Sequence, residues 1–313
     1  MKRFILKTLF LILPIFIAAI VIEFSLRQIP NDYVHKKKYL DKHSQNIQTL
    51  ILGNSHTFYG LNPVYFSNNT FNASHPSQTL DFDWALFNKY QNDLNSLKTI
   101  VLPISYFSLF DKLENTIEDW RVKNYAIYYG IKTGSLSDNF ELLNHPMKHN
   151  LHRLYSYYIN SKHDLVVSEL GWGTIYKSEE AMDLQETGKI SSERHTLDGI
   201  FSDKRTKILE EHLKTLNLFS EFCNQRNIKL IILTTPAYYT YRQNLNAEQY
   251  NKTAETINKF VNQHSNCYYL NWMDDTDFVA NDFFDADHMN EIGAEKLSSK
   301  ISNYIDWLES YID

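Results

Sequence analysis

The stretch that decides the fold reads Ile47-Gln48-Thr49-Leu50-Ile51-Leu52-Gly53-Asn54-Ser55-His56-Thr57. Its first part, residues 47–52, is typical of a buried β-strand, and Gly53 ends the strand in a sharp turn. In an open parallel sheet the active site lies beyond the carboxyl ends of the strands, so Ser55 is a candidate nucleophile ahead of a helix whose amides can face an anion. A serine after a strand is more often a turn residue or a helix cap, so a second motif is needed.

The rest of the chain repeats this alternation of strand and helix. Further strands are predicted at 70–73, 99–104, 229–234 and 267–270, and helices at about 80–95, 204–226, 247–263 and 290–311. This order predicts an α/β fold with a parallel sheet. The alternation stops between about residues 110 and 200, where Tyr, His and Asn are frequent, and we expect an insertion beside the sheet there.

The composition is that of a globular protein. Of 313 residues, 43% are hydrophobic and 22% charged, which excludes a disordered chain. The net charge is −6, and Lys and Arg form no basic stripe, so we expect no nucleic-acid partner. Cys223 and Cys267 lack the spacing of metal ligands, and we expect two buried thiols rather than a disulfide.

The N-terminus predicts a membrane anchor. From Phe4 to Phe24 the chain is apolar apart from Lys7, Thr8 and Glu23, and as a helix it spans about 31 Å, close to a bilayer core. A cleaved signal peptide is the alternative, but the segment lacks a small-x-small cleavage site. We therefore predict a retained single-pass anchor at residues 1–29, a polar stalk at 30–46 and a globular α/β domain at 47–313. The basic residues before the apolar run favour a cytoplasmic N-terminus and an extracytoplasmic domain.

A second chemical motif stands near the C-terminus, in Asp285-Ala286-Asp287-His288. The spacing lets a turn carry the carboxylate of Asp285 back to the imidazole of His288, whose other nitrogen then faces a nucleophile. We expect the Asp287 side chain to diverge from the ring. Because a helix is predicted directly after His288, its positive end favours the neutral imidazole that a general base needs. A metal site is the alternative, but no other His or Cys stands at ligand spacing nearby, so neither a metal nor another cofactor is expected.

Together the two motifs resemble the SGNH, or GDSL-type, hydrolase superfamily over about residues 47–110 and 204–310. Gly53-Asn54-Ser55 is similar to the family's Gly-Asp-Ser turn, with Asn54 in place of Asp, and Asp285 and His288 match its Asp-x-x-His block. The resemblance implies a three-layer α/β/α fold with a flavodoxin-like sheet, a catalytic triad of Ser55, His288 and Asp285, and ester hydrolysis or acyl transfer.

The middle blocks of that family match less well. The family places an oxyanion-hole glycine a few residues after an Asn that ends its second strand, and Ser77 holds that position here, after Asn72. The third block, Gly-x-Asn-Asp, is absent, and Ser105 is the candidate to replace its Asn. The resemblance thus implies an oxyanion hole made of the amides of Ser55 and Ser77 with help from Ser105.

Three further residues are candidates for substrate binding. Trp172, between two glycines, could offer an aromatic platform to a sugar ring, and His195 and Tyr238 belong to segments expected near the upper edge of the sheet. The alternative is that the tryptophan packs the insertion and that the histidine is merely exposed.

The departures in the middle blocks are similar to those of membrane-anchored members that modify cell-surface polymers, including D-alanyl transfer proteins and polysaccharide O-acetyl enzymes. This resemblance implies an acylated glycan or lipid substrate of the cell envelope and a membrane partner protein that donates the acyl group. An inactive binding or assembly factor with the same fold is the second hypothesis, because the third block is incomplete.

Overall fold

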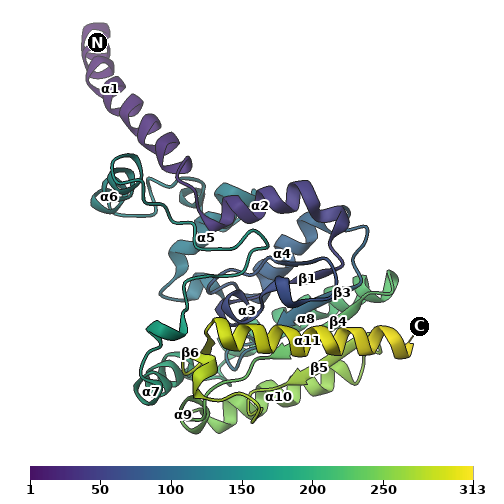
Figure 1. The fold of residues 1–313 in the computed structure, drawn as a ribbon. Helices are drawn as coiled ribbons and strands as arrows, with labels where there is room; N and C mark the ends of the chain where they lie inside the picture. Colours follow the sequence, from purple (N-terminus) through teal and green to yellow (C-terminus); the bar gives the residue numbers. More distant parts are fainter. Residues whose placement is uncertain (313) are drawn as a thin grey trace. The chain divides into compact units, whose positions relative to one another are not determined.

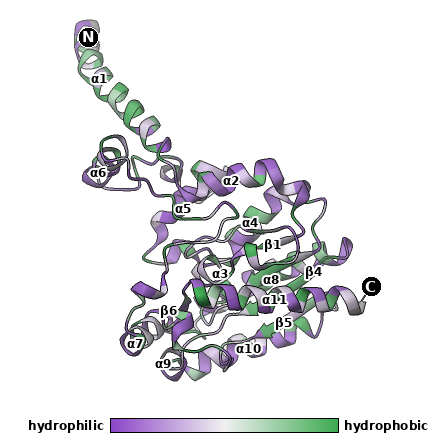
Figure 2. Cartoon of the chain, in the orientation of Figure 1, coloured by the Kyte–Doolittle hydropathy of each residue, from purple (hydrophilic) through white to green (hydrophobic). Residues whose placement is uncertain are grey.

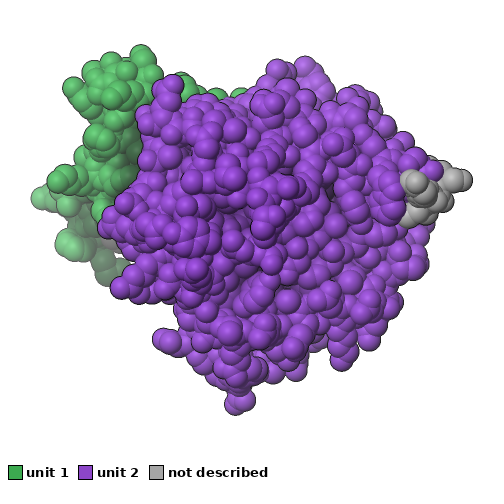
Figure 3. All heavy atoms as spheres, turned by 60° about the horizontal axis from the view of Figure 1, so that its bottom comes forward, with its two compact units in different colours: residues 1–38, 117–165 green, residues 39–116, 166–313 purple. Residues whose placement is uncertain are grey.

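The computed structural model describes residues 1–312, and Asp313, the last residue of the predicted hydrolase domain, lies outside the described residues. The chain divides into two compact units, which Figure 3 shows in different colours. Unit 1 comprises residues 1–38 and 117–165, and unit 2 comprises residues 39–116 and 166–313. Unit 2 holds all the predicted site residues and the sheet, whereas unit 1 holds the apolar N-terminal segment.

The sheet of unit 2 has five parallel strands (Figure 1). They are β1 (Thr49–Ile51), β2 (Thr70–Asn72), β3 (Thr99–Pro103), β4 (Lys229–Thr234) and β5 (Cys267–Asn271), in the order β2-β1-β3-β4-β5. This is the flavodoxin-like order, in which the strand sequence reverses between β1 and β3 and a ligand crevice opens. The predicted α/β fold is therefore confirmed, and Ser55 follows the strand at the switch point.

Helices cover both faces of this sheet because successive side chains of a strand point to opposite sides. Ile51 and Ile231 face α11 (Glu291–Ile312) and pack in one core cluster with Leu297 and Ile301 of that helix. On the opposite side Figure 1 shows α4 (Leu80–Tyr90) and α8 (Asp203–Gln225). These two helices meet through aromatic rings, and the arrangement is the predicted three-layer α/β/α architecture.

The remaining elements of unit 2 range from a two-residue strand to a helix of 15 residues. They include α3 (Ser55–Gly60), α7 (Leu184–His195), α9 (Tyr239–Gln243), α10 (Ala247–Val261) and an antiparallel pair of strands, β6 (Phe283–Asp285) and β7 (His288–Met289). The sequence predicts only a turn where β6 and β7 stand. Strands of two or three residues are too short to show a period of two, so the pattern could not reveal them.

The predicted insertion at about 110–200 is divided between the two units. Residues 117–165 cluster with the N-terminal segment in unit 1, whereas residues 166–200 belong to unit 2. There Val167 and Gly173 form an isolated antiparallel bridge. Both Cys223 and Cys267 are buried free thiols, as predicted.

Unit 1 contains α1 (Lys2–Arg27), the first part of α2 (Asp32–His43), α5 (Val122–Asn124) and α6 (Met147–Tyr158). The stretch Lys7–Arg27 is long and apolar enough to cross a membrane, and Figure 2 shows the apolar character of α1. A signal sequence has the same length and composition, so retention and orientation stay predictions. The predicted polar stalk is mostly helical, because α2 covers residues 32–43.

Candidate functional site

The turn after β1 lifts Ser55 to the start of a helix. Gly53 has φ = +108°, and a Cβ at this position would clash with the ring of Pro103 on β3, so only glycine fits. Asn54 then caps α3, because its side-chain oxygen accepts a hydrogen bond from the His56 amide at 3.0 Å. Ser55 is the first residue of α3 and is partly exposed. The local sequence thus presents a serine at the positive end of a short helix.

The β6–β7 pair brings His288 to that serine. Its Nε2 lies 2.8 Å from Oγ of Ser55, and its Nδ1 lies 2.9 and 3.1 Å from the two carboxylate oxygens of Asp285. Asp285 Oδ1 also accepts the backbone amides of Asp287 and His288, which fixes the carboxylate. A carboxylate only accepts, so Nδ1 carries a proton, and in the neutral ring Nε2 accepts the proton of Ser55. The structure therefore brings together Ser55, His288 and Asp285.

A second chain of hydrogen bonds runs beside the first. Asn54 donates to Oγ of Ser105 at 3.1 Å, Ser105 Oγ lies 2.7 Å from Nδ1 of His56, and His56 Nε2 lies 3.3 Å from Oδ2 of Asp287. Since the carboxylate only accepts, His56 Nε2 donates to it and Nδ1 accepts from Ser105. Ser105 and Asp287 are almost fully buried. Two Ser–His–Asp chains thus lie side by side, and only the first has a partly exposed serine.

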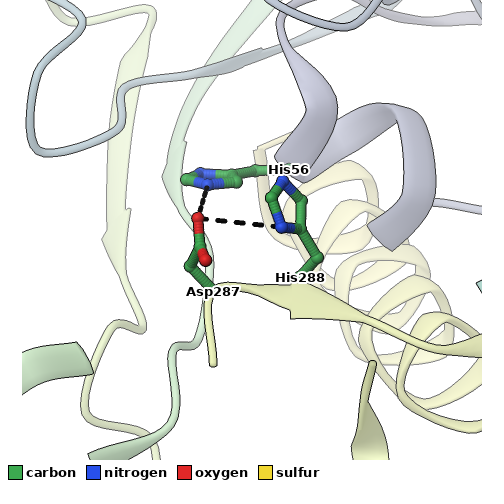
Figure 4. Close-up of side chains that lie close together, drawn as sticks. All are labelled: His56, Asp287 and His288. Carbon is green, nitrogen blue, oxygen red and sulfur yellow. Dashed lines mark hydrogen bonds and ion pairs between the residues drawn. The ribbon is translucent and has the colours of Figure 1, made fainter. Parts of the chain in front are cut away.

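Asp287 lies between the histidines instead of diverging from His288 as expected. Figure 4 shows its carboxylate between the rings of His56 and His288. Oδ2 is 3.7 Å from Nδ1 of His288 and 3.7 Å from Nδ1 of His195. The β6–β7 connection is only two residues long, so the side chain of its second residue turns back toward the ring of the next residue.

The pKa of His288 is shifted in the opposite direction to the one that the helix end predicts. Burial lowers the pKa of His288, but the carboxylates of Asp285 and Asp287 outweigh burial and raise this pKa to about 9. Burial raises the pKa of Asp287, but His288, His56 and His195 outweigh it and hold this pKa well below the usual range. Two close carboxylates therefore overcome the helix end that was expected to favour neutral imidazole. Burial lowers the pKa of His56 and lowers that of His195 to about 3, which keeps both rings neutral.

Two of the predicted oxyanion-hole residues, Ser77 and Ser105, lie on the loops after β2 and β3, and both loops contact the turn before Ser55. Ser77 has φ = +61°, the left-handed conformation that favours the glycine of the resembled family. Its loop is tied to the Ser55 turn, because the His75 amide donates to the carbonyl of Gly53 at 3.0 Å. The Ser105 proton is directed at His56, so donation by Ser105 to an oxyanion requires that bond to break. The roles of Ser55, Ser77 and Ser105 in an oxyanion hole stay predictions.

The expected platform at Trp172 is corrected by the structure. Trp172 is only 8% exposed, belongs to the core cluster beside α11, and donates from its indole N–H to the carbonyl of Tyr59 at 2.6 Å. Its face is therefore occupied by protein. Val167 and Gly173, which stand on either side of Trp172 in the sequence, form an isolated antiparallel bridge that the flanking glycines alone did not indicate.

The other two predicted substrate residues lie close to the site. Nδ1 of His195 is 2.9 Å from the hydroxyl of Tyr241, and its ring packs 4.2 Å from Phe107, so this histidine is a largely buried neighbour of Asp287. The Tyr238 amide donates to the carbonyl of Ala286 at 2.8 Å and so supports the β6–β7 connection. Contact of either residue with a substrate stays a prediction.

Sequence reasoning missed His56 and the central place of Asp287. Among the described residues, His56, Asp287 and His288 place possible metal-ligand atoms within 4.8 Å of one another (Figure 4). Sequence spacing alone did not reveal this cluster, because the fold brings His56 to the Asp–His pair from the other end of the chain, and the absence of a bound metal stays a prediction. A metal bound through Nδ1 of His288 would displace its hydrogen bond to Asp285, so this cluster competes with the Ser55 arrangement. The available signal was the His that directly follows Ser55.

The comparisons with known proteins add little to this geometry. No protein-family model and no curated protein matches the chain. Among solved structures the chain is similar to one from Bacteroides fragilis NCTC 9343 described as a "putative acylhydrolase", with 12% identity, a TM-score of 0.40, and coverage of 86% of this chain and 96% of that chain. At this identity and TM-score the likeness carries no argument about function. The chemistry of the site therefore has to be argued from the residues that form it.

Proposed function

We propose that the chain is an SGNH-type serine esterase or O-acyltransferase that acts on an acylated glycan or related substrate of the cell envelope. The observation that carries this proposal is the continuous contact from Ser55 Oγ through His288 to the carboxylate of Asp285. It stands at the switch point of a flavodoxin-like sheet, where such folds bind their ligands. Two sequence blocks far apart in the chain meet there, as the family resemblance implies.

The proposed reaction begins when His288 Nε2 takes the proton of Ser55 and Oγ attacks the ester carbonyl. The amides of Ser55 and Ser77 stabilise the oxyanion, while Asp285 holds the ring and stabilises the imidazolium. Collapse of the intermediate breaks the ester bond, and the leaving alcohol receives the proton from His288. Water or a sugar hydroxyl then attacks the acyl-serine with His288 as the base, which releases the acid or the acylated sugar and restores Ser55.

We place this reaction outside the cytoplasm, at the membrane that α1 would anchor. The apolar stretch Lys7–Arg27 supports membrane attachment. Attachment would concentrate the enzyme near envelope polymers and near a membrane protein that supplies acyl groups. No residue of the site separates hydrolysis from transfer, since both begin with the same acyl-serine.

The test uses the full chain in detergent with a fluorophosphonate probe, which reacts with activated serines. Labelling should occur on Ser55 and disappear in Ser55→Ala. Ser105→Ala is the matched control, since it removes the hydroxyl of the second Ser–His–Asp chain and should leave the label on Ser55. A label on Ser105 would overturn the assignment. No label on the folded wild-type protein up to pH 9.5 would favour the inactive assembly factor instead.

A further inference from the structure

A second candidate site lies in unit 1, apart from the chemistry of Ser55. An open cavity of about 440 Å³ is lined only by residues of this unit. Its wall comes from the segment that follows α1, from residues 120–128, and from α6 with the chain that flanks it. The insertion that interrupts the α/β pattern therefore forms a pocket with the chain next to the predicted anchor.

One face of α6 gives this pocket its histidines. His149 and His152 on the helix and His145 just before it are spaced four and three residues apart, which places them on one side of the helix. The rings of His145 and His149 are 4.5 Å apart, and His145 lies 5.3 Å from the ring of Trp120. The guanidinium of Arg121 stacks 4.4 Å from that tryptophan. A continuous row of nitrogen-rich groups thus lines the cavity.

The charged lining is mainly basic. Arg121, Lys123, Arg153 and Lys162 face the cavity against two carboxylates, Asp32 and Asp164. Lys123 and Arg153 also pair with the buried Glu141 behind the wall. Burial, with Lys123, His149 and Arg153 nearby, lowers the pKa of His145 to about 4, so added positive charge is disfavoured there.

Arg121 has unused binding capacity. Its NH2 group pairs with Glu118 at 3.2 Å, but among the residues that the structure describes its Nε is a buried donor without a hydrogen-bond partner. Buried donors are rarely left unsatisfied, so an acceptor that reaches this nitrogen would gain a hydrogen bond that the protein leaves unmade. Guanidinium groups bind phosphate oxygens well because their donors form a planar fork.

The opposite face of α6 is apolar and exposed. Leu151, Tyr155 and Tyr158 lie there, each at least half exposed, and the hydroxyl of Tyr158 donates to the carbonyl of Ser25 in α1 at 3.2 Å. An amphipathic helix of this kind, held against the end of a membrane-spanning helix, lies in the headgroup layer of a bilayer. Since the pocket begins at Ile29, two residues beyond α1, it would open at the depth of lipid phosphates.

We propose that the unit 1 pocket binds a phosphate ester through Arg121 and the histidine face of α6. Basic, nitrogen-rich walls and an unsatisfied guanidinium donor fit a phosphate group, and the pocket is large enough for a headgroup. A membrane lipid and a free phosphate ester share this chemistry, so the source is decided by experiment. This site is independent of the proposed acyl transfer.

The test is calorimetric titration of the full chain in detergent with three probes: dioctanoyl phosphatidic acid, glycerol 3-phosphate and dioctanoyl phosphatidylcholine. If only phosphatidic acid binds, the ligand is the phosphate of a lipid. If glycerol 3-phosphate binds with the same affinity as phosphatidic acid, the ligand is a soluble phosphate ester. Arg121→Gln should lower the affinity for the probe that binds by at least about tenfold, as expected for loss of a charge-assisted hydrogen bond.

His149→Gln is a second variant on the pocket wall that leaves Arg121 intact, and it should weaken binding about threefold or more. Lys148→Gln is the matched control, because Lys148 is exposed on the same helix outside the pocket. Ser55→Ala should bind as the wild type does, which separates this proposal from the proposed function. The proposal is overturned if neither phosphate probe binds, if phosphatidylcholine binds as tightly as phosphatidic acid, or if Lys148→Gln weakens binding as much as the pocket variants do.

Discussion

Asp287→Asn should shift the pH dependence of the enzyme toward neutral pH. His288 must be neutral to accept the proton of Ser55, but Asp285 and Asp287 hold its pKa at about 9. The rise from the ordinary 6.5 corresponds to a preference for the imidazolium of about 3 kcal/mol. At pH 7 only about one ring in a hundred would be a base, so kcat/KM of the wild type should rise about tenfold per pH unit up to pH 9.

The Asp287→Asn substitution removes one of the two carboxylates and keeps the shape of the side chain. The amide oxygen can still accept the proton on His56 Nε2, so the second hydrogen-bonded chain survives. Loss of one close charge typically lowers such a pKa by about one unit or more. We therefore expect kcat/KM at pH 7 to increase about tenfold, while the plateau at high pH stays within about tenfold of wild type.

Asp285→Asn is the comparison variant, because it removes the group that orients His288 as well as a charge. The high-pH plateau of its kcat/KM should fall at least ~10²-fold, since loss of the orienting carboxylate lowers kcat by up to ~10⁴-fold in triad enzymes. The assay measures kcat/KM for an activated acetyl ester from pH 6 to 10, with circular dichroism to show that both variants fold. An unmoved inflection in Asp287→Asn, or a greater plateau loss in this variant than in Asp285→Asn, would refute the assignment of the two carboxylates.

Four other predictions follow from the structure. Ser77→Gly should keep activity and raise the free energy of unfolding by up to about 1 kcal/mol, because glycine adopts the left-handed conformation without strain. Ser77→Val should lower the free energy of unfolding, and the melting temperatures of the two variants test both expectations. Trp172→Ala should lower the free energy of unfolding, measured by chemical denaturation, by about 3–5 kcal/mol. An unchanged stability with a change in KM alone would support the sugar-platform hypothesis instead. Chelators should leave fluorophosphonate labelling unchanged, while labelling that needs added Zn²⁺ would assign the His56, Asp287 and His288 cluster to catalysis. The intact protein should fractionate with membranes and keep its N-terminal Met-Lys-Arg segment, and a soluble product that starts near residue 23 would show a cleaved signal.

The elements that carry the fold could be read from the sequence because their signals are local. The five apolar runs became the five strands within about two residues at each end, since buried parallel strands need continuous apolar side chains. The long helices α4, α8, α10 and α11 followed from periodicity in the same way. Short elements such as β6, β7 and α9 depend on their neighbours, and no periodic signal marks them.

The sequence by itself also indicated that His288 and Asp285 meet Ser55, because a parallel sheet gathers the residues after its strands at one edge, and a spacing of three joins Asp285 to His288. Only the tertiary structure decided their electrostatics. It brought His56 and His195 around Asp287, set the carboxylates that raise the pKa of His288, and buried Trp172 against the core. Charge interactions and desolvation depend on distance and burial through space, and neither is encoded in the spacing of residues along the chain.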